Sequence, residues 1–281
     1  KIPDYYKFTV NSILSVDAEA NIFFCGSSIL NHKEIDFSHT EDIVSTLTNE
    51  IIDLNIYKDT SYEFKENRLW SDSLLRVFYI NDLAKNLNIE EFVHFDLDVI
   101  IYKSFSDLKH LFNPEKINIT EHIDNTPIFG YSYIPSSSLY SSLCSLIYKY
   151  IKDEYLERLK NKNIKPLNEM EMLSVIKKQN TSIFSSLPIL PYFKNKILFD
   201  PATYGQYFDG IPAKPYKKFR RRHISMEHIA GKEISSGRVE PIYRDRPLIK
   251  YNDNNYEIAN LHIHSKRLNK YLPENYKQII K

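Results

Sequence analysis

The sequence contains little of what several classes of protein depend on. Cys25 and Cys144 are its two cysteines, too few for a disulfide framework, and each lies in an apolar stretch where a free thiol packs as a small hydrophobe. No apolar run approaches the roughly 20 residues that span a bilayer. The formal net charge of +1 gives no general attraction to nucleic acid or to anionic lipid. We therefore expect a protein of a reducing, cytoplasmic compartment, with no transmembrane segment and no nucleic-acid partner.

The chain also lacks a stretch rich in proline, glycine or serine that would separate two domains. Its 281 residues are 42% hydrophobic and 26% charged, which is enough to bury one sizeable core. One dense basic run, Lys214–Arg222, stands out. Such runs are most often solvated surface, so contact with a phosphate or an anionic acceptor ranks second and nucleic acid third. We expect a single domain, with any peripheral membrane contact made through Lys214–Arg222.

The stretch Glu91–Tyr102 is an apolar run that is interrupted by two aspartates. The β-branched residues after Asp98 favour a buried strand over a helix, and in one strand Asp96 and Asp98 would project to the same face. Burying an ionised carboxylate is unfavourable unless a cation or strong hydrogen bonds compensate, and oxygen ligands suit Mg²⁺ or Mn²⁺. The pair predicts a metal site at the end of a strand. The ordinary alternative is that one aspartate caps a helix and the other faces water.

A helical pattern precedes this strand. Ser71–Asn88 carries leucine and phenylalanine at helical spacing, with Ser71 or Asp72 as the N-cap. A helix that leads into a buried strand is typical of an α/β crossover, and sheets of this kind bind ligands at the carboxyl ends of their strands. The order of these elements therefore favours a metal at Asp96 and Asp98.

The run Arg76–Tyr102 resembles the donor-binding core of metal-dependent glycosyltransferases with the GT-A fold, a class that includes bacterial and viral enzymes of surface glycans. The resemblance implies an α/β fold with a Rossmann-like mixed sheet flanked by helices. It implies that Asp96 and Asp98 hold Mn²⁺ or Mg²⁺ on the diphosphate of a nucleotide sugar, a UDP-sugar first and a GDP-sugar second. Arg76 and Leu97 would then contact this donor.

Two further positions match the order of motifs in the same family. Pro127–Ile134 has the pattern of a strand with Gly130 at a point of close backbone approach; the resemblance places Gly130 at the donor sugar, and a simple bulge is the alternative. Asn168 is an N-cap candidate, and a carboxylate in the following turn is what the helix dipole favours. Inverting GT-A enzymes have their general base at this place, so the resemblance implies a catalytic Glu169.

The segment Ile197–Gly210 combines a strand, a proline turn and a polar, aromatic loop. Aromatic rings beside amide and carboxylate groups suit sugars, because sugar rings have apolar faces and hydroxyls that need hydrogen bonds. The segment also resembles a phrase found in a subset of bacterial and viral glycosyltransferases. Asp200, Gln206 and Tyr207 are therefore candidates for contact with the sugar or the acceptor.

The stretch Ile258–Lys266 places two histidines on one face of a predicted strand. Partly exposed polar residues are one explanation of His262 and His264, and metal ligands are the other. Many GT-A enzymes place a C-terminal histidine on the cation of the Asp-x-Asp motif and a nearby lysine on the phosphates. The resemblance thus implies that His262 and His264 are metal ligands and that Lys266 contacts the donor.

Together these patterns predict a glycosyltransferase that moves a sugar to a hydroxyl of a glycan, a lipid-linked saccharide or a polysaccharide, with inversion if Glu169 is the base. We expect residues 1–135 to bind the nucleotide sugar and residues 136–281 to form the acceptor side with its histidine strand. One alternative is a phosphatase of the haloacid dehalogenase type that uses Asp96 and Asp98, although Ile100 stands where that motif has Thr or Val. The other is a catalytically retired glycan-binding domain, which has no physical reason to keep buried carboxylates.

Overall fold

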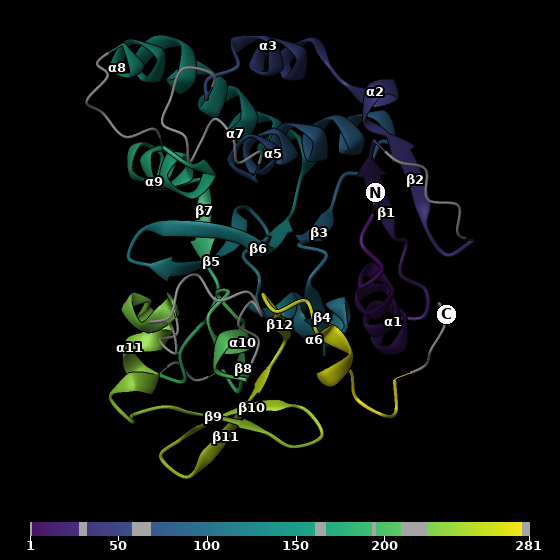
Figure 1. Ribbon diagram of the computed structural model, residues 1–281, viewed down its shortest axis with the longest axis vertical. Helices are drawn as coiled ribbons and strands as arrows, with labels where there is room; N and C mark the ends of the chain where they lie inside the picture. Colours follow the sequence, from purple (N-terminus) through teal and green to yellow (C-terminus); the bar gives the residue numbers. More distant parts are fainter. Residues whose placement is uncertain are drawn as a thin grey trace, which may run out of the picture.

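The computed structural model describes residues 2–27, 33–57, 69–160, 167–192, 195–208 and 224–276. It confirms the predicted α/β class, because helices cover sheets that contain both parallel and antiparallel pairs (Figure 1). The basic run Lys214–Arg222 lies outside the described residues. Within the described ranges, no helix is both long and apolar enough to cross a membrane.

Local sequence signals set several helix boundaries. Ser136 caps one helix by accepting the Leu139 amide, and Asn168 and Glu171 form a reciprocal capping box at the start of another. The second of these helices starts where the sequence predicts. The helices are α1 Tyr6–Val16, α2 Thr40–Ile43, α3 Thr46–Leu54, α5 Leu69–Asn86, α6 Phe105–Leu108, α7 Ser137–Tyr150, α8 Leu156–Leu159, α9 Glu169–Gln179, α10 Tyr204–Tyr207 and α11 Ile229–Ser235, with a π-helical segment at Ile151–Tyr155 and 3₁₀ turns at Lys109–Leu111, Ile224–Glu227 and Leu268–Lys270.

The strands are β1 Phe23–Gly26, β2 Asp36–His39, β3 Phe92–Phe95, β4 Val99–Ile101, β5 Ile117–Ile123, β6 Thr126–Ile134, β7 Phe184–Ser186, β8 Ile197–Leu198, β9 Glu240–Tyr243, β10 Pro247–Tyr251, β11 Asn254–Ile258 and β12 Asn260–His262. In the described part of the chain they pair in four groups, with the orders β3-β6-β5-β7, β8-β11-β10-β9, β12-β4 and β1-β2. Strands β10 and β11 form an antiparallel hairpin. Parallel pairs β1-β2, β5-β7 and β8-β11 make the fold mixed.

The stretch Glu91–Tyr102 is two strands of different sheets, and the prediction of one strand was wrong. β3 pairs with β6 whereas β4 pairs with β12, so the chain changes sheet at Asp96–Asp98, which we call the carboxylate turn. The Val99 amide donates to the Asp96 carbonyl at 3.2 Å and closes this turn. A turn leaves both carboxylates room for partners from other elements, which a buried strand would not.

Helices α2 and α3 are separate, because Ser45 leaves helical geometry to cap α3. One helix prediction and one strand prediction need small corrections. Ser71 and Asp72 lie inside the first turn of α5 rather than at its N-cap. The predicted histidine strand is shorter than expected and ends at His262.

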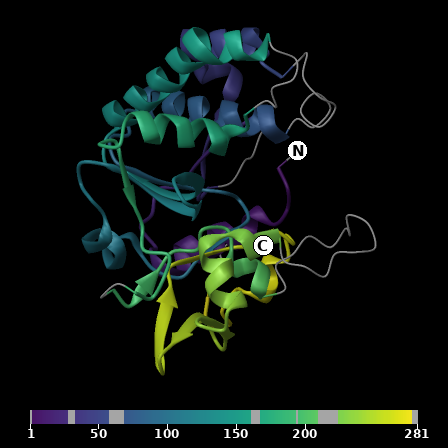
Figure 2. The same cartoon turned by 90° about the vertical axis from the view of Figure 1, so that its left-hand side faces the viewer.

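Helices α3, α5, α7 and α9 lie on one side of the β3-β6-β5-β7 sheet, as Figures 1 and 2 show. Their apolar side chains form one core with those of β5 and β6. A second core lies where β4, β12, α10 and α11 meet. Because β4 comes from residues 1–135 and β12 from residues 136–281, the two predicted halves share a sheet. The carboxylate turn joins the two parts of the molecule at this point.

Candidate functional site

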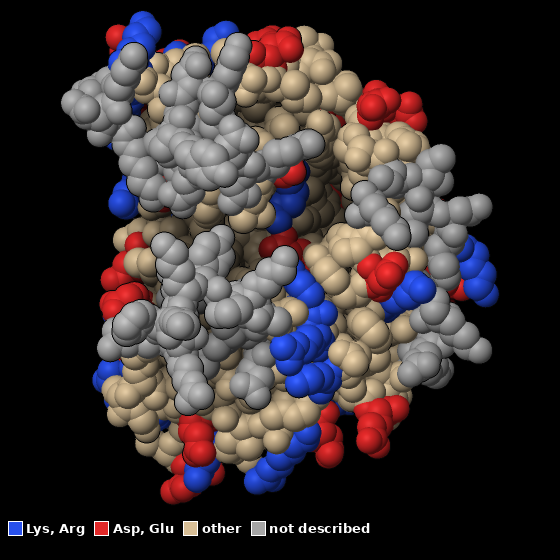
Figure 3. Space-filling view, viewed as in Figure 1, with Lys and Arg blue, Asp and Glu red and all other residues tan. Residues whose placement is uncertain are grey.

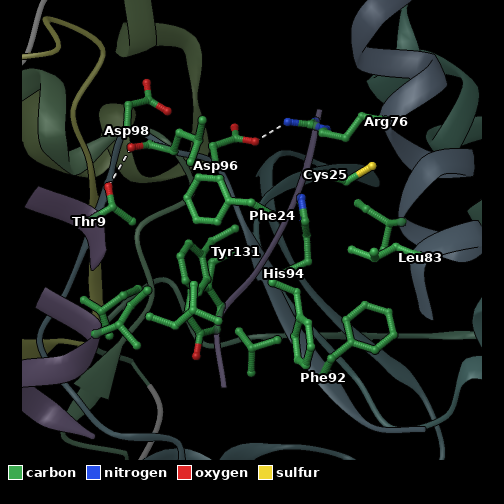
Figure 4. Close-up of a pocket in the computed structure, with 18 of the residues that line it drawn as sticks. Thr9, Phe24, Cys25, Arg76, Leu83, Phe92, His94, Asp96, Asp98 and Tyr131 are labelled. Carbon is green, nitrogen blue, oxygen red and sulfur yellow. Dashed lines mark hydrogen bonds and ion pairs between the residues drawn. The ribbon is translucent and has the colours of Figure 1, made fainter. Parts of the chain in front are cut away.

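A cleft with a volume of about 1540 Å³ opens at the carboxylate turn. Elements α1, β1, α5 and β3 contribute to its walls, and Glu169, His262, His264 and Lys266 reach it from later parts of the chain. Figure 3 shows a hollow with acidic residues deep inside it and basic residues above and below them. Figure 4 shows Asp96 and Asp98 above apolar side chains of the same cleft. The predicted metal ligands and most of the predicted donor residues thus converge in one place.

Hydrogen bonds from three elements hold the carboxylate turn. The Thr9 hydroxyl of α1 donates to the Leu97 carbonyl at 2.6 Å (Figure 4). The Ile263 amide, just after β12, donates to the Asp98 carbonyl at 2.8 Å, and the Asp96 amide lies 3.4 Å from a carbonyl of β6. Because main-chain atoms of the turn make these bonds, both carboxylates remain available to other partners.

Asp98, His262, His264 and Lys266 form a group that we call the histidine cluster. Nε2 of His262 lies 3.1 Å from Oδ2 of Asp98, and Lys266 donates to the same oxygen. The rings of His262 and His264 stack with their centroids 4.4 Å apart. One ligand atom each from Asp98, His262 and His264 lies within 4.8 Å of the other two. The sequence prediction that the two histidines share a face is therefore confirmed.

The charges within the histidine cluster stabilise each other. Burial would raise the pKa of Asp98, but His262 and Lys266 more than offset this effect and hold that pKa well below its usual range. Burial lowers the pKa of His262, but the neighbouring Asp98 raises it by more, so that the pKa lies above its usual value. Burial and the neighbouring His262 lower the pKa of His264 to about 4, which leaves this ring neutral at pH 7.

The donor set of the histidine cluster fits a divalent cation. One carboxylate and two imidazoles converge, and this mixed set suits Mn²⁺ better than Mg²⁺, which prefers oxygen ligands. Asp98 already attracts the positive charge of Lys266 and of His262, so a cation would replace charge that these side chains now supply. Asp96 lies beside this set rather than in it, with its Oδ2 3.8 Å from Nε2 of His262.

Arg76, Asp96 and Glu169 form a second group, the arginine cluster. Arg76 donates through Nη1 to Oδ1 of Asp96 (Figure 4), and its Nη2 lies 3.3 Å from Oε1 of Glu169. Burial would lower the pKa of Arg76, but the two carboxylates raise it, so the guanidinium stays charged. Burial raises the pKa of Glu169 against the opposing effect of Arg76. The predicted donor arginine and the predicted base are therefore in direct contact.

Gly130 lies in β6 directly against the histidine cluster. A Cβ atom at this position would come within 3.0 Å of Nδ1 of His262, so the predicted close approach at this glycine is confirmed. Its neighbour is the histidine ring, and Gly130 is absent from the described lining of the cleft. The glycine therefore lets His262 lie against the sheet, and its contact with a donor sugar stays a prediction.

Of the three predicted sugar contacts, Asp200 and Gln206 are buried and Tyr207 is partly exposed. Asp200 is 1% exposed, and its carboxylate accepts backbone amides. Gln206 is buried and donates to a backbone carbonyl at 3.1 Å, and the hydroxyl of Tyr207 lies 3.4 Å from another. None of the three contributes to the cleft lining within the described ranges. The structure does not bring them to the carboxylate turn, and their contact with an acceptor stays a prediction.

Sequence reasoning missed the residues of α1 that reach the site. The Tyr5 ring lies near the ammonium group of Lys266, 5.7 Å from Nζ to the ring centroid, and Thr9 holds the carboxylate turn. The Ser12 hydroxyl accepts the Ile101 amide of β4 at 3.0 Å. A signal existed in the sequence, because Thr9 and Ser12 are hydroxyl residues in a helix whose neighbouring positions pack into the core.

Comparisons with known proteins give a similarity among solved structures but none to a family model. No family model matches the chain, and no curated protein matches it. Among solved structures, the chain is similar to the crystal structure of mouse xyloside xylosyltransferase 1 in its apo form, with 12% sequence identity and a TM-score of 0.42. The match covers 66% of this chain and 79% of the mouse chain. A similarity of this degree defines neither fold nor activity, so the function has to follow from the residues of the cleft.

Proposed function

We propose that this chain is a divalent-metal-dependent glycosyltransferase that moves a sugar from a nucleotide-sugar donor to a hydroxyl acceptor. The proposal rests on one observation, the convergence in one cleft of a cation-binding donor set, two basic side chains and a buried glutamate. These residues are Asp98, His262, His264, Lys266, Arg76 and Glu169. Transfer from a nucleotide sugar needs all three parts. The cation and the basic side chains stabilise the departing diphosphate, and the glutamate accepts the proton of the attacking hydroxyl.

The histidine cluster would hold the cation through Asp98, His262 and His264, with Asp96 beside them. A divalent cation there, Mn²⁺ first and Mg²⁺ second, supplies neutralisation of the diphosphate and Lewis-acid stabilisation of the leaving group. Lys266 bonds to Asp98, but its side chain is 46% exposed, so its ammonium group can turn to a phosphate oxygen of the donor.

Arg76 connects the donor side of the cleft to the acceptor side. Its guanidinium has several N–H donors, of which one bonds to Asp96 and one lies close to Glu169. The permanent charge of Arg76 keeps Asp96 oriented beside the histidine cluster, and it adds to the positive potential that a diphosphate meets. We expect a UDP-sugar to be the donor, with a GDP-sugar second, and Leu97 to border the donor through the carboxylate turn.

Glu169 is the residue that we assign as general base. It would accept the proton of the acceptor hydroxyl as that oxygen attacks the anomeric carbon, which implies inversion. Because burial raises its pKa, Glu169 is a stronger base than a solvated glutamate. Departure of the diphosphate leaves oxocarbenium character on the sugar, as in glycoside hydrolysis. The acceptor is then a hydroxyl of a glycan, a lipid-linked saccharide or a polysaccharide.

Neither alternative function gains support from the contacts of the described residues. A phosphatase with Asp96 as nucleophile would need a free carboxylate, but Oδ1 of Asp96 is bonded by Arg76. In a catalytically inactive binding domain, a buried carboxylate between His262 and Lys266 would cost desolvation energy and serve no purpose. The paired charges of both clusters favour an active enzyme.

Thermal stability of the purified chain with UDP, GDP, CDP or dTDP, each with and without Mn²⁺, tests the proposal. A ligand at a hundredfold excess over its dissociation constant adds about 2.7 kcal/mol of stability, which raises the melting temperature measurably. We expect one of the four nucleotides to stabilise the chain, and to do so only when Mn²⁺ is present. Stabilisation by the metal ion without any nucleotide effect would favour a phosphatase, and no shift under any condition would favour a catalytically inactive domain.

A further inference from the structure

The segment Asp200–Gly205 passes directly under the two histidines of the cleft, and we call it the orienting turn. The carboxylate of Asp200 accepts four backbone amides, which belong to Thr203 at 2.7 Å, Tyr204 at 2.8 Å, Gly205 at 3.1 Å and His262 at 2.9 Å. Three of these bonds form the turn itself. The fourth ties the turn to the backbone of a predicted metal ligand.

A second contact joins the orienting turn to the other histidine. Nε2 of His264 lies 3.2 Å from the carbonyl oxygen of Ala202. A carbonyl oxygen can only accept a hydrogen bond, so Nε2 of His264 carries the proton and donates it. In a neutral imidazole, Nδ1 then holds the lone pair that can bind a cation. The Ala202 carbonyl thus selects the tautomer of His264 and the atom through which it can act as a ligand.

The backbone of the orienting turn is shaped for these two contacts. Ala202 has a φ of 57°, in the left-handed region that a residue with a side chain rarely adopts. A Cβ atom at position 205 would lie 1.8 Å from the carbonyl oxygen of His262, so that glycine is required where the turn meets β12. Asp200 and Gly205 are therefore both fitted to His262, and neither belongs to the described lining of the cleft.

We propose that the orienting turn positions the two histidines as metal ligands, and that Asp200 is its central positioning residue. The inference rests on the proposed function, because it assumes that a cation binds at the histidine cluster. A partner of the second ring nitrogen of a ligating histidine fixes the orientation of the ring, and its loss typically costs about 10- to 100-fold in metal affinity. The bond from the His262 amide to Asp200 fixes the backbone from which the other ligand projects, so we expect its loss to act in the same direction. In this role Asp200 acts through the backbone of His262 and not as a ligand of the cation.

Calorimetric titration of the purified chain with Mn²⁺ tests this role in Asp200→Asn. Asparagine has the shape of aspartate, but an NH₂ group replaces one of the two carboxylate oxygens. An NH₂ group cannot accept a hydrogen bond, so either the bond from the His262 amide or bonds that form the turn are lost. We expect Mn²⁺ affinity to fall about 10- to 100-fold. Thr203→Val is the matched control: its hydroxyl lies 2.9 Å from Nδ1 of His228 and has no contact with either ligand. The control should lose stability without losing Mn²⁺ affinity.

A second measurement uses the wild-type chain and does not depend on a folded variant. Nitrogen NMR of the chain labelled with ¹⁵N-histidine, at pH 7 and without metal, should show His264 neutral with its proton on Nε2. Addition of Zn²⁺ as a diamagnetic probe should then shift the Nδ1 resonance of His264. A proton on Nδ1, or a Zn²⁺ shift confined to Nε2, would overturn the inference.

The outcomes separate this inference from the proposed function. If wild-type chain binds Mn²⁺ and Asp200→Asn binds it equally well, the orienting role is wrong and the metal site stands. If Asp200→Asn and Thr203→Val lose Mn²⁺ affinity to the same extent, the turn has only a structural role and the inference is wrong. If wild-type chain binds neither Mn²⁺ nor Zn²⁺, the proposed function fails together with the ligand role of the turn.

Discussion

Asp96 and Asp98 are one residue apart, yet they belong to two different chemical settings. Asp98 is 4% exposed and lies among two histidines and Lys266, whereas Asp96 is bonded by Arg76 next to Glu169. In a strand these side chains would share one face and one set of partners. In the carboxylate turn they contact different partners, so Asp98 belongs to the histidine cluster and Asp96 to the arginine cluster.

This difference assigns a separate task to each cluster. The histidine cluster has the donor atoms that a cation needs, and the arginine cluster has the buried carboxylate that a base needs. Asp96 belongs to the second but lies 3.8 Å from His262 of the first, which makes it the point of contact between them. Variants of each cluster should therefore fail in different measurements.

Asp98→Asn should have the largest effect. It removes the charge that attracts the cation, and metal-ion catalysis supplies several kcal/mol, so turnover should fall by about 1,000-fold or more. Donor turnover and Mn²⁺-dependent nucleotide binding are the measurements. Asp96→Asn is the matched control, since it makes the same chemical change one position away and should keep most of the Mn²⁺ affinity. Wild-type turnover in Asp98→Asn would contradict the metal hypothesis.

Glu169→Gln should affect transfer without affecting the donor. The amide cannot accept a proton, and loss of a general base typically costs about 100-fold or more in rate. Transfer to an acceptor and binding of the nucleotide with Mn²⁺ should be measured on the same preparation. An unchanged transfer rate would remove Glu169 as the base, and inversion would lose its support.

His264→Ala should weaken Mn²⁺ binding by about 10- to 100-fold. Loss of a partner that orients a ligating histidine typically has an effect of the same size. His262→Ala should do the same, because both rings belong to the donor set. Titration of each variant with Mn²⁺ shows which of the two histidines is a ligand. If only His262→Ala loses affinity, His264 is a neighbour of the site and not a ligand.

Arg76→Lys should have the smallest effect of the four. A lysine keeps the charge but cannot reach Asp96 and Glu169 together, and one charge-assisted hydrogen bond contributes about 1.5–3 kcal/mol. Because the lysine keeps the charge and can retain one of the two contacts, we expect the lower end of this range, a rise of about 10-fold in the donor KM, with Mn²⁺ affinity unchanged. A loss of Mn²⁺ affinity in this variant would show that the two clusters are not separate.

The sequence predicted those features that local signals determine. The cap at Asn168, the strand around Gly130 and the shared face of the two histidines depend on residues within a few positions of one another. The α/β class followed from the same periodicities. These predictions succeeded because a helix cap or a strand face needs no information from the rest of the chain.

Features that depend on distant partners were not predictable. The end of the strand at Asp96 follows from β4 pairing with β12, which lies more than a hundred residues further along the chain. The prediction for Asp200 rests on its residue type, and nothing near it in the chain indicates that its carboxylate accepts the amide of His262. In the same way, Thr9 gained its role only when α1 packed beside the carboxylate turn.

Crystals soaked with Mn²⁺ and UDP, measured at the manganese absorption edge, test the central claim most directly. The account predicts one anomalous peak in the cleft, within bonding distance of Asp98, Nε2 of His262 and Nδ1 of His264, with the diphosphate on its open side. A peak on Asp96 and Glu169 instead, or a bound nucleotide without any peak at the histidine cluster, would contradict it.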